Sequence, residues 1–248
     1  MSNQFEIRKE IAVPASVDQV WRAVATPEGQ AGWSPDPYAS TDGQIVVEEP
    51  PGRFSVRAPT EPNGAFHQFE YLIDANDDGA RLVFIHSGDL GDDWQADFDY
   101  AELTSYGWDL YMHTLQQYLT YFPGRQAAFV TGQAPEHANT HEAWIKLTEA
   151  LGLSDGTAAL NVGDSVQLTP EGLPVIDGVI DYVQPGEDFL AVRVDDGLYR
   201  FHSLERMGMP LAFGHYLYCT SDDAELDLDR SALEQKWQFW LEGLYTHA

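Results

Sequence analysis

The strongest constraint on the fold of this chain is a single long apolar stripe near its middle. Large apolar residues recur there at intervals of three and four, which places them on one face of a helix running from about Tyr100 to Phe122. The stripe consists of Trp108, Met112, Leu115, Leu119 and Phe122. Pro123 and Gly124 follow and are expected to end the helix. A helix with one apolar face must bury that face against another layer.

The residues before this helix can supply that layer. Apolar and polar residues alternate over residues 5–13, which predicts an opening strand with one buried face. Ser16 followed by Gln19 is a capping-box signature, and Pro27 begins a second short helical turn. Residues 43–87 are rich in β-forming residues broken by turn residues. The order predicts an α+β fold in which a curved antiparallel sheet wraps around the long C-terminal helix.

Three segments resemble a known family, in order along residues 1–123. They are the Pro-Ala-Ser-Val-Asp-Gln-Val-Trp stretch within residues 13–33, the strand-like segment 79–88, and Gly107-Trp108 leading into Leu119. Together they resemble activator of heat shock protein ATPase homologues (AHSA-type domains) of the START-like (SRPBCC) superfamily. The resemblance implies a helix-grip (START/Bet v-like) fold. It says less about function, because the superfamily includes lipid carriers, polyketide cyclases, hormone receptors and cochaperones.

Residues 124–248 repeat the same plan in a degenerate form. A strand at 127–133, a helix capped by Asn139 and a final striped helix follow one another as in the first half, and residues 198–201 echo residues 81–84. The final stripe consists of Leu233, Trp237, Trp240 and Leu244. We therefore expect two helix-grip domains in tandem, a first at 1–123 and a second, shorter SRPBCC-like domain at 124–248. A β-rich appendage packed on the first domain is the alternative.

Composition limits the classes of function. The chain has 248 residues, with 40 acidic against 13 basic residues and a formal net charge of -27. Such a charge repels nucleic acid and anionic lipid surfaces, so we expect neither a nucleic-acid nor a membrane partner. No signal-peptide pattern and no apolar run of membrane-spanning length is present, which makes the cytoplasm the expected location.

Several residues invite chemical interpretations that their surroundings do not favour. His137 and His141 are four apart but straddle a helix start and lack a third ligand. The acidic run from Asp89 to Asp99 lacks the spacing of a calcium loop, and Trp94 within it is either a lid or an anchor. Cys219, the only cysteine, is more typical of a buried small residue than of a nucleophile. We predict no metal site, no cofactor and no catalytic motif.

The resemblance implies a cavity between the sheet and the long helix. Its predicted wall is Trp33, Phe54, Phe69, Tyr71, Phe84, His86, Trp108, Tyr111 and Met112. His86 alternates with Leu82 and Phe84, which favours a place at the rim of that cavity and a polar contact with the ligand.

The favoured function is binding of a small lipophilic molecule without catalysis. Two alternatives stay open. The family resemblance suggests a chaperone-associated, partner-binding protein. The same cavity would also suit a cyclase or hydrolase in which His86 works with a nearby carboxylate.

Overall fold

The computed structural model describes residues 3–35, 43–95, 98–183, 188–218 and 223–246. The chain divides into two compact units, Met1–Gln126 and Ala127–Ala248. In the described residues no helix is long and apolar enough to cross a membrane.

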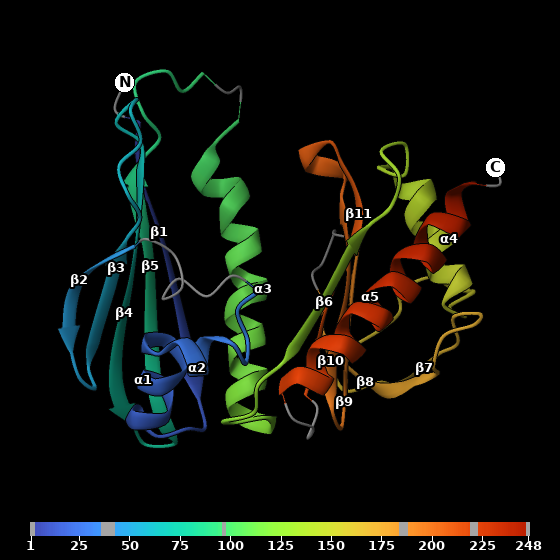
Figure 1. The fold of residues 1–248 in the computed structure, drawn as a ribbon, viewed down its shortest axis with the longest axis horizontal. Helices are drawn as coiled ribbons and strands as arrows, with labels where there is room; N and C mark the ends of the chain where they lie inside the picture. The colour runs from blue at the N-terminus through green and yellow to red at the C-terminus, as the bar shows by residue number, and fades with distance from the viewer. Residues whose placement is uncertain (1–2, 36–42, 96–97, 184–187, 219–222, 247–248) are drawn as a thin grey trace. The chain divides into compact units, whose positions relative to one another are not determined.

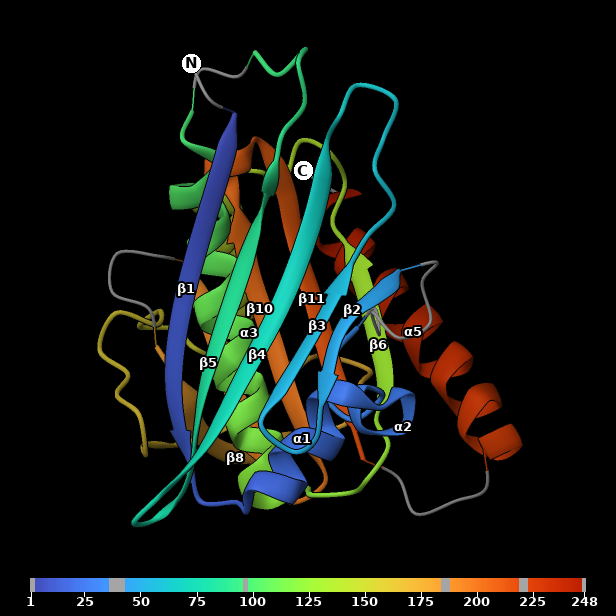
Figure 2. The same ribbon diagram turned by 90° about the vertical axis from the view of Figure 1, so that its left-hand side faces the viewer.

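Unit 1 is one antiparallel sheet with a long helix at its C-terminal end. Its strands lie in the order β1-β5-β4-β3-β2 (Figures 1 and 2). In chain order its elements are β1(Gln4–Val13), α1(Val17–Ala25), α2(Pro27–Gln30), β2(Gln44–Glu49), β3(Arg53–Arg57), β4(Phe66–Asn76), β5(Gly79–Asp89) and α3(Tyr100–Tyr121).

Local capping chemistry sets where the helices of unit 1 begin. The Ser16 hydroxyl accepts a hydrogen bond from the Gln19 N–H at 3.3 Å, and the Ser16 N–H donates to Gln19 Oε1 at 2.9 Å. These two bonds complete the predicted capping box of α1. Asp99 caps α3 in the same manner, because its Oδ1 accepts from the Glu102 N–H at 3.0 Å.

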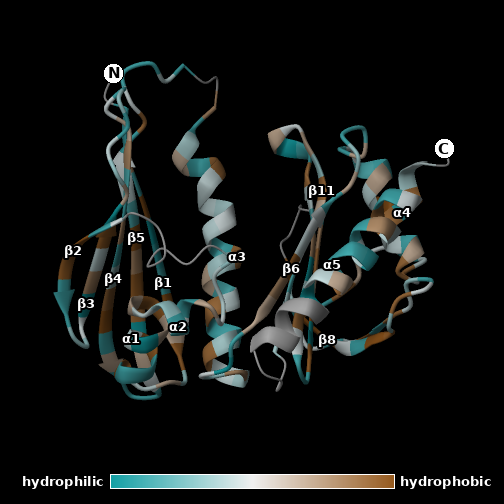
Figure 3. Cartoon of the chain, viewed as in Figure 1, coloured by the Kyte–Doolittle hydropathy of each residue, from teal (hydrophilic) through white to brown (hydrophobic). Residues whose placement is uncertain are grey.

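Helix α3 buries its apolar stripe against the sheet, as the sequence predicts. All five stripe residues are buried. Polar contacts with β1 flank the stripe: Lys9 Nζ lies 2.6 Å from Asp109 Oδ1, and Gln116 Nε2 donates to the Ala12 carbonyl at 2.8 Å. Hydrophobic and hydrophilic residues accordingly interleave along α3 and the strands (Figure 3).

Unit 2 follows the same plan with one additional strand. Its sheet has the order β6-β11-β10-β9-β8-β7, and α5 contacts β6 through Gln238 Nε2, which donates to the Gln133 carbonyl at 2.8 Å. Its elements are β6(Ala128–Gln133), α4(His141–Ala150), β7(Ser165–Leu168), β8(Ile176–Tyr182), β9(Phe189–Val194), β10(Gly197–Leu204), the 3-10 turn η2(Glu205–Met207), β11(Met209–Leu217) and α5(Asp223–Thr246).

The predicted fold class is confirmed, with two corrections of detail in unit 2. Each unit is α+β, with an antiparallel sheet and a long C-terminal helix in the helix-grip order. The cap of α4 is Thr140, not Asn139, because Thr140 Oγ1 accepts from the Ala143 N–H at 3.2 Å.

The second correction concerns which strands of the two units correspond. The echo between residues 198–201 and 81–84 pairs the wrong strands. By position in the sheet β11 is the counterpart of β5, and β10 is the counterpart of β4. The two segments look alike because an Asp-Gly turn precedes each of them, Asp78-Gly79 before β5 and Asp196-Gly197 before β10.

Candidate functional site

The interior of unit 1 is an aromatic cluster built on strands β3, β4 and β5 and helix α3. Strand register places Phe54, Tyr71 and Phe84 side by side, with Phe69 opposite His86. Ring centroids are 5.2 Å apart for Tyr71 and Phe84 and 4.6 Å apart for Phe69 and His86. The helix completes the cluster with Trp108, whose ring lies 4.3 Å from Phe84.

The predicted wall residues therefore divide into two groups. One group is joined through ring contacts, and it contains Phe54, Phe69, Tyr71, Phe84, His86, Trp108 and Tyr111. Met112 is buried on the same helical stripe. Trp33 is buried as well, but its indole N–H donates to the Ala23 carbonyl at 2.9 Å, so it anchors the segment after α2 to α1.

A chain of hydrogen bonds runs through this cluster. Trp108 Nε1 lies 2.9 Å from His86 Nδ1, and His86 Nε2 lies 3.0 Å from His67 Nδ1. An indole N–H can only donate, so His86 Nδ1 must accept. His86 then carries its proton on Nε2, and this N–H donates a hydrogen bond to His67 Nδ1. Both nitrogens of His86 are thus occupied by protein partners.

His86 lies deeper than the rim position expected from its place near the strand end. Its exposed fraction is 3%, because Phe5, Phe69 and Trp108 surround it. Burial and, to a smaller extent, the neighbouring His67 lower the pKa of His86 to about 3. Burial also lowers the pKa of the half-buried His67. Both imidazoles are neutral at pH 7.

A group of aromatic residues lies at the His67 end of this hydrogen-bond chain. We call it the aromatic mouth, and it consists of Phe5, His67, Trp94, Phe98 and Tyr100. The ring of His67 is 5.6 Å from Phe5 and 6.1 Å from Tyr100, and Trp94 packs edge-on against Tyr100 and Phe98. Phe98 is 52% exposed. Phe5, His67 and Tyr100 are not among the site residues predicted from the sequence. The signal for His67 was its alternation with Phe69 and Tyr71, which places all three on one face.

Gly88 leaves room for this arrangement. It pairs with Phe5 on one side and with His67 on the other. A Cβ at position 88 would lie 2.1 Å from the Phe66 carbonyl oxygen and 3.1 Å from the Phe5 ring. Any side chain here would force the backbone at Phe66 to move, and the Phe5 ring would have to shift by a few tenths of an ångström.

Tyr71 has a buried hydroxyl without a hydrogen-bond partner. Its exposed fraction is 0%, and its oxygen has no donor or acceptor within reach in the described part of the chain. Burial raises the pKa of this hydroxyl, so it stays protonated. An unsatisfied buried hydroxyl costs about 1–3 kcal/mol. The interior of unit 1 thus holds a buried hydroxyl that no described protein atom satisfies.

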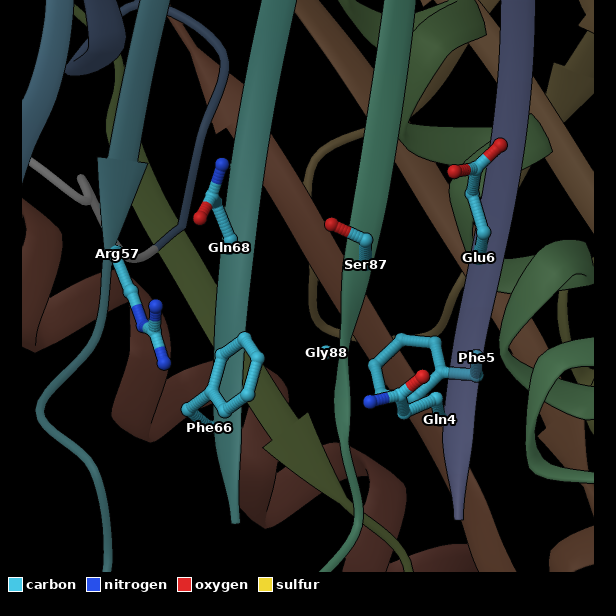
Figure 4. Close-up of a pocket in the computed structure, with 8 residues that line it drawn as sticks. All are labelled: Gln4, Phe5, Glu6, Arg57, Phe66, Gln68, Ser87 and Gly88. Atoms are coloured by element: carbon cyan, nitrogen blue, oxygen red, sulfur yellow. The ribbon is translucent and has the colours of Figure 1, made fainter. Parts of the chain in front are cut away.

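A hollow of about 500 Å³ borders the opposite face of the sheet. Its polar side chains come from Glu6, Gln68 and Ser87, and it also reaches Phe5 and Gly88 beside the aromatic mouth (Figure 4). The guanidinium carbon of Arg57 lies 3.7 Å from the centre of the Phe66 ring at its edge. Side chains alternate between the faces of a strand, so this hollow does not share the polar groups of the aromatic interior.

The other candidate residues take structural roles. His137 Nε2 lies 3.3 Å from the Tyr245 carbonyl, whereas His141 Nδ1 lies 2.6 Å from Asp188 Oδ2, so the two histidines face different partners. In the acidic run, Asp93 accepts from Asn63 at 2.6 Å. No group of three metal-ligating side chains occurs in the portion that the structure describes. Cys219 and Asp97 lie outside the described residues.

Unit 2 carries a partial counterpart of the hydrogen-bond chain. His215 on β11 packs against Trp237 of α5 with ring centroids 4.8 Å apart and planes at 75°, the angle found between His86 and Trp108. Its Nδ1, however, accepts from the Arg200 backbone N–H at 3.2 Å, and its buried Nε2 has no partner among the described residues. Strand register puts Gly197 where unit 1 has His67, so no second imidazole continues the chain.

Comparisons with known proteins yield structural similarities only. No protein-family model and no curated protein matches the chain. The Aha1 dimer from Colwellia psychrerythraea is 14% identical and covers 46% of this chain and 96% of its own, with a TM-score of 0.36. DynU16, from the dynemicin biosynthetic locus, is 18% identical over 96% of this chain and 97% of its own, with a TM-score of 0.38.

A third similar structure is the di-domain ARO/CYC BexL from the BE-7585A biosynthetic pathway. It is 14% identical and covers 97% of this chain and 97% of its own, with a TM-score of 0.39. At such identities and TM-scores these similarities assign no function to this chain.

Removing the Tyr71 hydroxyl should not destabilise the ligand-free protein. We expect Tyr71→Phe to leave the free energy of unfolding unchanged or raised, because the hydroxyl has no partner. Tyr245→Phe in unit 2 is the matched control. It removes a hydroxyl that donates to the Ala143 carbonyl at 2.7 Å and should cost about 1 kcal/mol. Urea denaturation measures both, and an equal loss in the two variants would contradict the assignment.

The depressed pKa of His86 should make the protein less stable in acid. Below pH 6.5 the unfolded chain binds a proton at this residue that the folded chain excludes, so stability falls as pH drops towards 3. His86→Gln can keep both hydrogen bonds but does not titrate. Between pH 6 and 4 its free energy of unfolding should fall less steeply, by about 1 kcal/mol per pH unit.

His141→Gln is the control for that experiment. Asp188 raises the pKa of His141, so this residue adds stability as pH falls and its loss cannot flatten the acid slope. Equal slopes for wild type and His86→Gln in urea titrations would show that His86 is not held neutral.

Proposed function

We propose that unit 1 binds a small lipophilic molecule against its aromatic interior and does not act on it chemically. The observation that carries this proposal is the unpartnered Tyr71 hydroxyl within a cluster of aromatic rings. Apolar walls with one or two fixed polar groups are typical of sites for lipophilic ligands, where the rings supply affinity and the polar groups fix orientation. The aromatic mouth, with Phe98 exposed, is the proposed entrance.

The cyclase or hydrolase alternative is less well supported by the same geometry. A catalytic acid or base must reach a substrate proton, and both nitrogens of His86 already bond to Trp108 and His67. Binding of a small molecule is therefore the function that the site supports best.

Titration of 15N-labelled protein with the neutral probe N-phenyl-1-naphthylamine tests this function. The indole N–H signal of Trp108 should shift on binding, because its ring belongs to the cluster. The matched control is the indole signal of Trp237 in unit 2, which should not move. Trp108→Phe and Trp237→Phe assign the two signals. No shift at the solubility limit of the probe, or a shift of the Trp237 signal alone, would refute the proposal.

A further inference from the structure

The hydrogen-bond chain of unit 1 can run in one direction only. Trp108 has a donor and no acceptor, so each following group must accept on Nδ1 and donate from Nε2. His67 is the last member. Its Nδ1 lone pair is occupied by the proton of His86, and its own proton therefore sits on Nε2. The hydrogen-bond chain therefore ends in the His67 Nε2–H, which can only donate, and neither nitrogen of His67 has a free lone pair.

The described surroundings of His67 do not satisfy that donor. No partner for its Nε2 occurs among the described residues, and the ring is half-buried between Phe5 and Tyr100. A donor placed at an aromatic mouth is suited to an acceptor atom on the incoming molecule.

The charges around His67 indicate which kind of ligand atom can accept its Nε2–H. Among the described residues, the ring neighbours of His67 are Phe5, His86 and Tyr100, and none of them is positively charged at pH 7. The chain as a whole carries a formal charge of -27, which raises the free energy of any bound anion. A neutral oxygen acceptor fits this setting better than a carboxylate or phosphate.

We infer that the ligand of this site is a neutral lipophilic molecule bearing a carbonyl or ether oxygen, which the His67 Nε2–H binds at the aromatic mouth. This inference rests on the proposed function and adds a ligand class to it. His67 is the specificity-determining residue, and Trp108 and His86 are positioning residues that hold its proton on Nε2. Unit 2, with Gly197 at the equivalent position, lacks this donor.

Three probes with one ring system test the inference by calorimetric titration: 2-acetylnaphthalene, 2-ethylnaphthalene and 2-naphthoate. In the wild type, the ketone should bind at least as tightly as the ethyl compound and more tightly than the anion. His67→Phe should weaken ketone binding about 3- to 10-fold and leave ethyl binding within about twofold. His67→Gln should restore ketone binding, because the amide can accept from His86 and donate outward.

The outcomes separate this inference from the proposed function. Binding of 2-ethylnaphthalene with no effect of His67→Phe on the ketone would overturn the inference and leave the proposed function standing. Tightest binding of 2-naphthoate would overturn the choice of a neutral acceptor. Binding of none of the three would remove the proposed function and the inference together. In the unmodified protein, the ketone should also shift the His67 Nε2 signal in 15N spectra, and an unmoved signal would count against the contact.

Discussion

The hydrogen bond from Trp108 to His86 is the contact on which the account of unit 1 depends. It is a polar bond between helix and sheet inside an otherwise aromatic layer, and buried polar bonds of this kind allow few alternative packings. It fixes the rotation of α3 against β5 and selects the tautomer of His86. Through His86 it also selects the tautomer of His67, with the proton on Nε2. A hydrogen bond in the core therefore decides that the aromatic mouth presents a donor to a ligand.

The two units share a plan but differ where a ligand would bind. In unit 1, His86 on β5 packs against Trp108 of α3. In unit 2, His215 on β11 packs in the same way against Trp237 of α5. Unit 1 extends this pair outward through His67 and Phe5, whereas unit 2 has Gly197 and Ala128 at the equivalent positions. In unit 2 the histidine bonds to a backbone N–H instead. We interpret unit 2 as a copy that keeps the packing and lacks the outward donor.

Local signals in the sequence were sufficient for most of the fold. The stripe on α3, the Ser16 capping box and the alternation in β1 each involve residues close together in the chain. The site was harder, because Phe5, His67 and Tyr100 meet only through the register of distant strands and the packing of a helix. The same limitation explains why the sequence matches β10 with β5. The two strands share a preceding Asp-Gly turn, whereas their places in the sheets are known only from the structure.

Long-range 15N–1H NMR of the histidine rings at pH 7 tests the central claim most directly. The account predicts that His86 and His67 are both neutral and that each carries its proton on Nε2, as the donor-only indole of Trp108 requires. In Trp108→Phe this constraint is removed and the tautomers are free to mix. A proton on Nδ1 of either histidine in the wild type would contradict the direction of the chain and the donor assigned to the mouth.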